Sequence, residues 1–509
     1  MMAQRRDAKS LMLQDLLAGM VDVGEYGRLL ISDVSLDSRD ARAGGLFMAV
    51  PGQTSHGMDH LEQAVSQGVA AVLAEPSGRW ERARLVQAAG RLEVPLFMVS
   101  GLREKAGGIA ARFFGHPGQA LRVIGVTGTN GKTSVSHFLA HSLAHRVASG
   151  LLGTLGNGRV GDLRPASHTT PDAVAVQAEL ARQLDMGIKA VAMEVSSHAL
   201  DQGRVTGVPF HTAVFTNLSH EHLDYHGSMA AYAEAKAGLF RRPGLMNAVI
   251  NVDDAYGQQL FQEINRRVLV VACTLCKGLP AGADRFVRAL EVEPGADGLR
   301  ISFDSSWGAG EIRTRLLGRF NAENLLLTLG VLLSWDMPLA TAIDALQDLQ
   351  PVAGRMNLIA VKGQPRVVVD YAHTPDALGQ VLSSLREHVR GHLVCVFGCG
   401  GERDREKRPR MGELAQRLAD RVILTDDNPR RENADAILAE ILSGMSNPEA
   451  VVVQRDRAKA IAQAVSDACP DDLVLIAGKG HEAYQLVGDL RLPFSDSDQA
   501  RQALGRRAA

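Results

Sequence analysis

Short runs of apolar and β-branched residues recur along the chain, and most of them stop at a small or polar loop. In the middle of the chain these runs are Arg122–Val126, Lys189–Met193, Thr212–Phe215 and Ala248–Asn251. A helical pattern of apolar positions lies between two of them, at Asp172–Leu184. Strand-length runs that alternate with helices indicate βα units and a mostly parallel sheet.

The same alternation fills the last third of the chain. The expected strands there are Arg366–Val369, His392–Phe397, Arg421–Leu424 and Asp472–Ala477. Each of them runs into a polar or glycine-rich loop, and in an open α/β sheet ligands bind beyond the carboxyl ends of the strands. We therefore expect one functional edge on each sheet.

The first part of the chain has shorter strand candidates, such as Gly45–Val50 and Val69–Ala74, and it closes at the turn-forming cluster Gly115–Gly118. A chain of 509 residues is long enough for about two to four domains. We predict an α/β protein with three: a smaller N-terminal α/β domain, a central domain with a mostly parallel sheet, and a Rossmann-like C-terminal domain. The predicted boundaries are 1–117, 118–349 and 350–509.

Composition excludes several classes of function. The formal net charge is only −2, which gives no electrostatic footprint for nucleic acid and no polybasic membrane surface. The sequence has no uninterrupted apolar run of about 18 residues and no signal-peptide core, so we expect a cytoplasmic protein without a membrane anchor. Cys273 and Cys276 form a lone C-x-x-C pair, where we expect reduced thiols, with zinc as the alternative.

The most specific motif is RVIGVTGTNGKTS at 122–134, in which a strand enters a glycine-rich turn and then a helix. Backbone N–H groups and the helix N-terminus would hold phosphates, Lys132 would neutralise their charge, and the Thr133 hydroxyl would ligate Mg²⁺. Val126 stands where the strict rule wants glycine, and a tight turn in a protein without nucleotide is the alternative. The pattern favours a P-loop ATPase-like central domain. Its expected nucleotide-binding residues are Gly128, Thr129, Asn130, Gly131, Lys132, Thr133 and Ser134.

Two polar clusters follow in the central domain. Glu194 ends an expected strand, where a carboxylate beside a triphosphate is a natural Mg²⁺ ligand and an ordinary surface carboxylate is the alternative. The stretch NLSHEHLDYH (217–226) places histidines at alternate positions. We favour one histidine at a Mg²⁺ or phosphate site over a zinc cluster, because the H-E-x-x-H spacing is missing. From its pattern alone, Lys236 would be a solvated helix lysine.

Taken together, TGTNGKT, MEVSSH, the histidine stretch and a lysine in a Y-x-x-A-K-like context resemble the Mur ligase superfamily. The further motifs that match are LDSR (36–39), GRFN (318–321), GRM (354–356), DYAHTP (370–375), GCGGERD (398–404), DNPR (427–430) and GKGHE (478–482). The resemblance covers nearly the whole chain. It implies an N-terminal domain for the UDP end of a substrate, a central ATPase domain, and a C-terminal domain for an incoming amino acid.

The resemblance also implies a reaction of cytoplasmic peptidoglycan-precursor synthesis. ATP would phosphorylate the D-glutamate γ-carboxylate of UDP-MurNAc-L-Ala-D-Glu, and an amine would attack the acyl phosphate to give an amide, ADP and phosphate. The implied catalytic residues are Lys132, Glu194, His222 and Lys236, and the implied metal site consists of Thr133, Glu194, His222 and Lys236. Lys236 matches a lysine that is carbamylated by CO₂ in this superfamily, which reverses the interpretation from its pattern. The carbamate is anionic and can ligate a second Mg²⁺, and its formation requires a neutral amine with a lowered pKa.

Binding residues are carried over from the matching motifs in the same way. Contacts to ATP would come from Asn321, Arg355 and Asp370. Contacts to the UDP-linked substrate would come from Leu36, Ser38, Gln53, Thr54, Ser55, Thr169, Thr170, Ser196, Gln202 and Arg204. His168 departs from the pattern, because the family usually has asparagine before the threonine pair.

The superfamily members that add the third amino acid use mainly meso-diaminopimelate or L-lysine. Meso-diaminopimelate has an extra carboxylate and ammonium, so its pocket needs a cation and several acceptors. Arg430 can clamp a carboxylate bidentately and Pro429 would stiffen the loop around it. Asp426 has no role in this scheme and is expected to be a solvated neighbour. The other expected contacts are a second cation at Arg403, and acceptors at Asp427, Asn428, Glu482 and the Gly478 carbonyl.

We predict meso-diaminopimelate as the amino acid, with UDP-MurNAc-L-Ala-D-Glu, ATP and Mg²⁺ as the other ligands, and a monomer that binds no nucleic acid. The nearest alternative is the same ligase with L-lysine. A folylpolyglutamate-synthase-like ligase is a more distant alternative, against which GKGHE and DNPR argue. A non-catalytic nucleotide-binding switch is the alternative from another class, and DNPR would then be an ordinary Asx-Pro turn.

Overall fold

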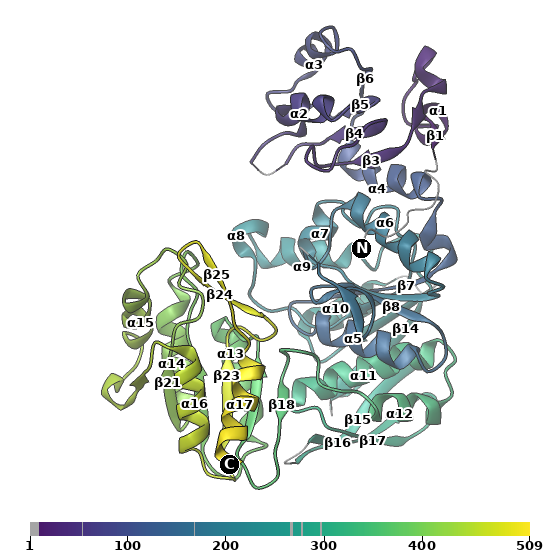
Figure 1. The fold of residues 1–509 in the computed structure, drawn as a ribbon. Coiled ribbons are helices and arrows are strands. Elements are labelled where there is room, and N and C mark those ends of the chain that lie inside the picture. Colours follow the sequence, from purple (N-terminus) through teal and green to yellow (C-terminus); the bar gives the residue numbers. More distant parts are fainter. Residues whose placement is uncertain are drawn as a thin grey trace. The chain divides into compact units, whose positions relative to one another are not determined.

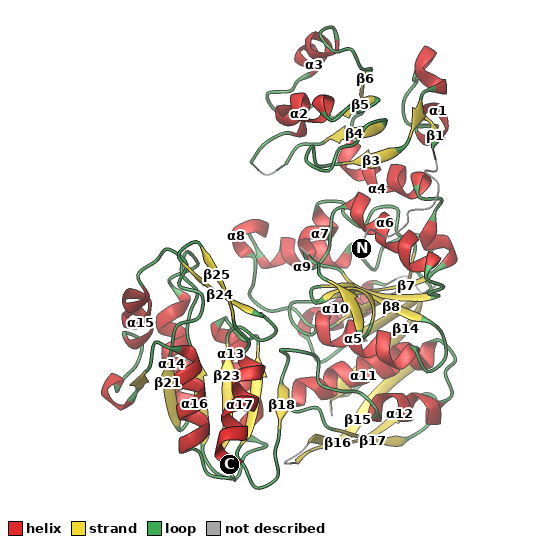
Figure 2. Cartoon of the chain, viewed as in Figure 1, coloured by secondary structure: helices red, strands yellow, loops and turns green. Residues whose placement is uncertain are grey.

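The computed structural model describes residues 10–52, 54–166, 168–264, 268–275, 278–295 and 298–508, and the chain forms two compact units (Figure 1). The first unit holds the chain up to Cys273, together with Leu279–Phe286 and Gly330–Asp336, and the second holds the rest. Both combine helices with sheets of parallel strands, so the predicted α/β class is confirmed (Figure 2). The exact domain boundaries at 117/118 and 349/350 stay predictions.

The first sheet of the first unit has four parallel strands in the order β3-β4-β5-β6. Along β4, Leu46 and Met48 pack in one core with helix α4, whereas Phe47 and Ala49 pack in a second core with helix α2. A parallel strand buried on both faces needs the continuous apolar run that the sequence shows here. The elements are β3 (Asp33–Ser35), β4 (Gly45–Ala49), β5 (Ala71–Ala74), β6 (Leu96–Met98), α2 (Leu61–Ser66), α3 (Arg82–Ala89) and α4 (Leu102–Phe113).

The second sheet of this unit has the order β10-β9-β8-β11-β7-β12-β13-β14, with the six strands from β8 to β14 parallel. Helices α6, α7, α9 and α10 supply apolar residues to one core with these strands, and α5 packs on β8 and β11. The strands are β7 (Arg122–Thr127), β8 (Ser149–Gly153), β9 (Gly156–Arg159), β10 (Asp162–Arg164), β11 (Ala190–Glu194), β12 (Phe210–Phe215), β13 (Asn247–Asn251) and β14 (Leu269–Leu275). The helices are α5 (Lys132–Leu143), α6 (Ala173–Asp185), α7 (Ser197–Asp201), α8 (Leu223–His226), α9 (Met229–Ala237) and α10 (Ala255–Glu263).

In the second unit, an antiparallel arrangement of β15, β16 and β17 was not predicted from the sequence. The sheet that follows has the order β18-β19-β23-β20-β21-β22, and only β18 is antiparallel in it. Helices α13, α14 and α15 share a core with one face of this sheet, and α16 and α17 share a core with the other face. A sheet covered by helices on both faces confirms the predicted Rossmann-like architecture.

The bounds of these elements follow the apolar runs closely, and the predicted strand Arg421–Leu424 coincides with β21. The strands are β15 (Arg285–Gly295), β16 (Gly298–Ser305), β17 (Gly310–Thr314), β18 (Asn357–Ile359), β19 (Arg366–Asp370), β20 (Leu393–Phe397), β21 (Arg421–Leu424), β22 (Val452–Val453), β23 (Leu473–Ala477), β24 (Tyr484–Val487) and β25 (Leu490–Pro493). The helices are α11 (Arg319–Ser334), α12 (Leu339–Gln347), α13 (Pro375–Arg386), α14 (Lys407–Leu418), α15 (Ala434–Leu442), α16 (Arg457–Asp467) and α17 (Asp496–Ala508). Among the described residues, no helix is both long enough and apolar enough to cross a membrane.

A buried ion pair fixes the carboxyl end of β23. The Arg457 Nε and NH2 groups lie 2.7 Å from the two carboxylate oxygens of Asp496, and neither side chain is exposed. Arg457 NH2 also donates to the Ala477 carbonyl at 3.0 Å. One guanidinium therefore joins the first turns of α16 and α17 to the last residue of β23, where the GKGHE motif begins.

We expect Asp496→Asn to destabilise this region by about 3–5 kcal/mol, because it leaves the buried Arg457 guanidinium without a counter-charge. Native-state hydrogen exchange at the β23 amides measures the local free energy of opening. Asp498→Asn is the matched control, since Asp498 lies in the same helical turn and forms an exposed pair with Arg501; its effect should stay within about 0.5 kcal/mol. Equal effects of the two substitutions would contradict this role of the buried pair.

Candidate active site

The predicted phosphate loop lies between β7 and α5. Gly131 has a left-handed backbone and precedes the first residue of α5, Lys132. The Lys132 ammonium donates to the carbonyls of Gly128 and Thr129, at 2.8 and 2.7 Å. The loop, its lysine and the N-terminus of α5 thus have a strand–loop–helix geometry that suits an anion, and phosphate binding by these residues stays a prediction.

The loop after β12 supports the phosphate loop from the side. Asn217 accepts from Thr129 N at 2.8 Å through its carbonyl and from Asn130 N at 2.9 Å through its side chain. The Thr216 hydroxyl donates to the Asn130 carbonyl at 2.5 Å and also occupies the space that a Cβ on Gly128 would need. Thr216 and Asn217 were not predicted as site residues, although they directly follow the strand that pairs with β7.

Glu194 ends β11, and its fully buried carboxylate is held by three donors. The Thr133 hydroxyl donates to it at 2.8 Å, and Thr154 donates through its backbone N–H at 2.7 Å and its hydroxyl at 3.1 Å. Glu194 is therefore an interior carboxylate and not the surface carboxylate that we considered as its alternative. The carboxylate and the Thr133 hydroxyl are hard oxygen ligands beside the phosphate loop, so they fit Mg²⁺ with phosphate and water as further ligands.

Lys236 in α9 is 1% exposed, so the solvated lysine inferred from pattern alone is wrong. Its ammonium nitrogen donates to the Gly128 carbonyl at 2.8 Å and lies 4.2 Å from the centre of the Tyr232 ring. Burial lowers the pKa of Lys236 well below its ordinary value, and the nearby Lys132 charge lowers it further. Both effects favour the neutral amine over the ammonium at the point where the side chain reaches the phosphate loop.

The predicted histidine stretch forms an aromatic cluster. The ring centres of His198 and His222 are 4.7 Å apart, and His226 approaches Ser197 through Nε2 at 3.0 Å. Burial, and then the neighbouring His222, lowers the pKa of His198 to about 4, so His198 is neutral. Among the described residues, no group of three or more His, Cys, Asp or Glu side chains is placed to hold a metal ion. Cys276, from the C-x-x-C pair, lies outside the described residues.

The cluster is connected to the phosphate loop through Tyr232, which the sequence did not single out. Its ring centre lies 6.2 Å from that of His222, and its hydroxyl lies 3.2 Å from the Thr129 hydroxyl. This chain of contacts joins the end of the histidine stretch to the loop that follows β7.

Four of the expected substrate contacts form one connected surface beside Glu194. The Thr170 hydroxyl donates to the Glu194 carbonyl at 2.8 Å and accepts from Ser196 N at 3.1 Å. Arg204 donates to the Thr170 carbonyl at 3.0 Å and to the Gln202 side chain at 2.9 and 2.6 Å. The Thr169 hydroxyl lies 3.0 Å from the Thr154 hydroxyl, which places the threonine pair next to the buried carboxylate.

The other expected contacts of the UDP-linked substrate lie around the N-terminal sheet. Ser38 is buried and its hydroxyl donates to Gln63 at 2.8 Å, and Leu36 packs partly buried against the core that α4 covers. Thr54 and Ser55 are exposed in the loop after β4. Gln53 lies outside the described residues. His168, which replaces the usual asparagine, is exposed.

In the second unit, the predicted ATP contacts lie near the turn that precedes β18. Asp370 is buried and accepts from Met356 N and Ala372 N, each at 2.7 Å. Burial raises the pKa of Asp370, and the opposite effect of the nearby Arg355 charge is smaller. The Arg355 guanidinium lies 5.1 Å from the centre of the Tyr371 ring. Asn321 is buried in the first turn of α11, where its amide donates to the Leu317 carbonyl at 2.8 Å.

The motifs GCGGERD, DNPR and GKGHE lie close together because the strands that precede them, β20, β21 and β23, are neighbours in the sheet. Asn428 donates to the Glu482 carboxylate at 2.8 Å, and the buried Lys479 ammonium donates to both Asn428 and Glu482, at 3.0 and 2.9 Å. Burial raises the pKa of Glu482, but the bonds from Lys479 and Asn428 outweigh it and leave that pKa lowered. Lys479 was missed as a site residue, although it lies inside the GKGHE motif.

Arg430, Arg403 and Asp427 surround the same strand ends. Arg430 NH1 donates to the Gly401 carbonyl at 2.7 Å, and a Cβ on Gly400 would lie 3.0 Å from Arg430 NH1 and 3.8 Å from the Arg403 side chain. Asp427 is 8% exposed, and burial raises the pKa of its carboxyl group.

Asp426 is not the solvated neighbour that we expected. Its carboxylate pairs with Arg455 at 3.1 Å and is only 15% exposed. This pair could not be predicted from the sequence, because Arg455 follows the next strand of the sheet, β22, and meets Asp426 only once β21 and β22 pair.

Family models of the Mur ligases match the chain in three parts. The Mur ligase family catalytic domain matches residues 30–113, the Mur ligase middle domain matches 126–332, and the Mur ligase glutamate ligase domain matches 354–480. Together these matches cover most of the chain and include the phosphate loop and the clustered C-terminal motifs. The chain therefore belongs to the Mur ligase family.

Curated relatives are similar over nearly the full length. A UDP-N-acetylmuramoyl-L-alanyl-D-glutamate–2,6-diaminopimelate ligase of Alkalilimnicola ehrlichii is 48% identical over 501 residues, which cover 97% of this chain and 98% of that protein. The ligase of the same name from Pseudomonas aeruginosa is 47% identical over 481 residues, which cover 94% of this chain and 95% of that protein.

Solved structures give the same result for the fold. A structure of a ligase with this name matches with a TM-score of 0.72 at 34% identity and covers 98% of this chain and 100% of that chain. A folylpolyglutamate synthase of Mycobacterium tuberculosis, solved with ADP and AMPPCP, matches with a TM-score of 0.59 at 18% identity. It covers 74% of this chain and 92% of that chain, and at this identity the likeness shows the fold alone.

We expect Gly128→Ala to weaken nucleotide binding about tenfold or more, because the new Cβ would collide with the Thr216 hydroxyl and displace the phosphate loop. Calorimetric titration with a non-hydrolysable ATP analogue measures the change. Gly161→Ala is the control: Gly161 also has a positive φ, 93°, but open space surrounds its missing side chain. If both variants bind the analogue like the unmodified protein, the close packing around Gly128 has no part in nucleotide binding.

Proposed function

We propose that this protein is the ATP-dependent ligase that joins meso-2,6-diaminopimelate to the D-glutamate γ-carboxylate of UDP-MurNAc-L-Ala-D-Glu, releasing ADP and phosphate. The supporting observation is that two clusters of side chains suit the ligands of such a reaction. One is the phosphate loop with Lys132, Thr133 and Glu194, and the other is the cluster of charged side chains around Arg430. The names of the full-length relatives, at 47–48% identity, agree with this assignment.

The first step requires the approach of two anions, the substrate carboxylate and the γ-phosphate. The backbone N–H groups of the phosphate loop and the N-terminus of α5 would bind the phosphates, and the Lys132 ammonium would neutralise their charge. Arg204 lies beside the Thr169–Thr170 pair and would orient the acceptor substrate through its phosphate or carboxylate groups. Holding carboxylate and phosphate in line supplies much of the catalysis in such a reaction.

Mg²⁺, bound by Thr133 and Glu194, would supply further neutralisation of the phosphate charge. We place His222 at the same site, because its ring reaches the phosphate loop through Tyr232. Thr154 would keep the Glu194 carboxylate correctly oriented through its two hydrogen bonds.

Lys236 fits the carbamate that the resemblance implies. At pH 7 a lysine with an ordinary pKa is neutral in only roughly one molecule in 2,500. Burial lowers the pKa of Lys236 well below its ordinary value, which favours the neutral amine that takes up CO₂. The resulting carbamate would place an anionic oxygen pair beside the Gly128 carbonyl and the Lys132 ammonium, where it would ligate a second Mg²⁺.

The cluster around Arg430 suits an amino acid with two ends. Arg430 would clamp the distal carboxylate of meso-diaminopimelate, with Arg403 as the second cation. The Asn428 side-chain oxygen already accepts from Lys479 and from Leu486 N, at 3.0 and 2.9 Å. We therefore assign the distal ammonium to the carboxylates of Asp427 and Glu482 and to the Gly478 carbonyl, while Asn428 positions Glu482.

The reaction uses ATP and a nucleotide-linked sugar, so we place it in the cytoplasm. One chain carries the side chains proposed for all three substrates, so a monomer suffices.

Release of ADP in the presence of UDP-MurNAc-L-Ala-D-Glu and each candidate amino acid tests the assignment. We expect meso-diaminopimelate to be by far the better substrate. Arg430→Ala should raise its KM by a factor of about 100 or more, with the KM for ATP nearly unchanged, because one charged partner of the distal carboxylate is lost. Better activity with L-lysine would refute the choice of amino acid, and ATP binding without amide formation would favour a nucleotide-dependent switch.

Lys236→Ala should abolish ligation while leaving the protein folded, and a small added carboxylate such as formate should restore part of the activity. The unmodified protein, incubated with ¹³C-labelled bicarbonate, should show a carbamate resonance that the variant lacks. Near-wild-type activity of Lys236→Ala would remove the carbamate from the mechanism.

A further inference from the structure

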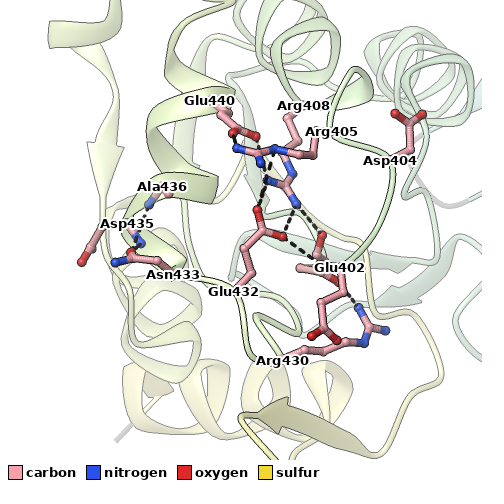
Figure 3. Close-up of polar contacts among 12 residues, drawn as sticks. Glu402, Asp404, Arg405, Arg408, Arg430, Glu432, Asn433, Asp435, Ala436 and Glu440 are labelled. Atoms are coloured by element: carbon pink, nitrogen blue, oxygen red, sulfur yellow. Dashed lines mark hydrogen bonds and ion pairs between the residues drawn. The ribbon is translucent and has the colours of Figure 1, made fainter.

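A fully buried arginine, Arg408, lies behind the two loops that carry the proposed amino-acid contacts. We call residues 398–404, after β20, the glycine loop, and residues 425–432, after β21, the Arg430 loop. Arg408 lies in the first turn of α14, and its side chain has no exposed surface (Figure 3). It does not belong to any motif used above to assign the function.

The Arg408 guanidinium has partners on both loops. Its NH2 group donates to the Gly400 carbonyl of the glycine loop at 3.2 Å and to Glu432 of the Arg430 loop at 2.8 Å. Its NH1 group donates to Glu432 and to Glu440 of α15, each at 2.7 Å. The pair with Glu432 is bidentate, which fixes direction as well as distance.

Glu432 extends this connection back to the glycine loop. Its carboxylate also accepts from Glu402 N at 2.8 Å, as Figure 3 shows, and its own N–H donates to the Pro429 carbonyl at 3.1 Å. Hydrogen bonding from Arg408, and then from Glu402 N, lowers the pKa of Glu432 to about 2. Glu432 is therefore ionised throughout the physiological range and remains a partner of Arg408.

The two loops also contact each other next to Arg430. Gly401 N donates to the Asn428 carbonyl at 2.9 Å, and Arg430 NH1 donates to the Gly401 carbonyl at 2.7 Å. Arg430 and Glu402 both have left-handed backbones, with φ of 51° and 54°. Such conformations cost about 1–3 kcal/mol in a residue other than glycine and persist only where the surroundings hold them. At Arg430 the surroundings include the β24–β25 hairpin, because the Arg430 N–H donates to the Leu486 carbonyl at 3.0 Å and the Arg430 carbonyl accepts from Gly488 N at 2.8 Å. At Glu402 they include the bond from its N–H to Glu432, the partner of Arg408.

We propose that Arg408 is a positioning residue for the amino-acid substrate: it holds the glycine loop and the Arg430 loop in register, and so sets where the Arg430 guanidinium stands. The inference rests on the proposed function of Arg430 as the clamp for the distal carboxylate. Arg408 itself is buried behind the loops and would not touch the substrate. A planar fork of donors is required, because three acceptors on two loops and one helix must be reached at once.

Steady-state kinetics of Arg408→Lys provides the test. Lysine keeps the charge but lacks the fork, so it cannot bond Glu432 bidentately and reach the Gly400 carbonyl as well. We expect the KM for meso-diaminopimelate to rise about tenfold or more, with the KM for ATP and for UDP-MurNAc-L-Ala-D-Glu within about twofold of the unmodified values. In an Arg430→Ala background, the same substitution should change the KM for meso-diaminopimelate by less than about twofold, because its effect acts through Arg430.

Two further variants keep the test decisive. Arg405→Met is the matched control: Arg405 pairs with the same Glu440 and lies 3.9 Å from Glu432, but it is 65% exposed, so its removal should leave all three KM values nearly unchanged. Glu432→Gln keeps the shape and removes the charge, and it should reproduce the selective rise; it carries the test if Arg408→Lys does not fold.

Three results would overturn the proposal. The first is an unchanged KM for meso-diaminopimelate in a folded Arg408→Lys protein whose Arg430→Ala counterpart shows the large rise. The second is an equal rise of all three KM values together with a lower melting temperature, which is the result for a purely structural ion pair. The third is a protein that does not ligate meso-diaminopimelate at all, and this result would refute the proposed function as well.

Discussion

The site around the phosphate loop depends on one constraint: a fully buried carboxylate needs hydrogen-bond donors around it. Glu194 meets this requirement through Thr133 and Thr154, which come from the helix after β7 and from the segment after β8. Because β11 lies between β8 and β7, its last residue reaches both neighbours at once. The strand order of the sheet therefore fixes an anionic oxygen pair beside the phosphate loop. The same geometry gives Lys132 and the proposed Mg²⁺ a common place to act.

In the second unit, buried cationic side chains hold the ends of the strands in place. Arg457 fixes the end of β23, Lys479 joins Asn428 to Glu482, and Arg408 joins the loops that follow β20 and β21. Each of these cations is buried and compensated by carboxylates, and breaking such a pair is costly. None of the three was assigned a substrate contact. They hold the carboxyl ends of adjacent strands in place, so that the more exposed Arg430 and Arg403 can select a ligand.

Strands that are buried on both faces could be predicted from the sequence, since they read as continuous apolar runs. The run Arg421–Leu424 coincides with β21, and Lys189–Met193 differs from β11 by one residue at each end. The antiparallel strands β15–β17 were missed, because they alternate charged with apolar residues at a sheet edge and carry a weaker signal.

Some residues of the candidate site could be predicted from the sequence and others could not. Lys132 and Thr133 could be located because they belong to the motif that follows β7, and Glu194 could be located because it ends the apolar run of β11. Thr154 and Arg408 could not, since the carboxylates that they bind lie 24 to 40 residues away in the sequence. These partners come together only through the order of the strands. The burial of Lys236 could not be predicted from the residues around it in the sequence. Only the resemblance to a family indicated its role.

The central claim is that the γ-carboxylate of the acceptor is activated by phosphorylation before the amine attacks. Transfer of oxygen tests it most directly. UDP-MurNAc-L-Ala-D-Glu labelled with ¹⁸O in the γ-carboxylate is incubated with ATP, Mg²⁺, meso-diaminopimelate and the protein, and the released phosphate is analysed by mass spectrometry. We expect one ¹⁸O atom in each phosphate released, because the carboxylate oxygen that attacks the γ-phosphorus leaves with it. Amide formation with unlabelled phosphate would rule out an acyl phosphate intermediate.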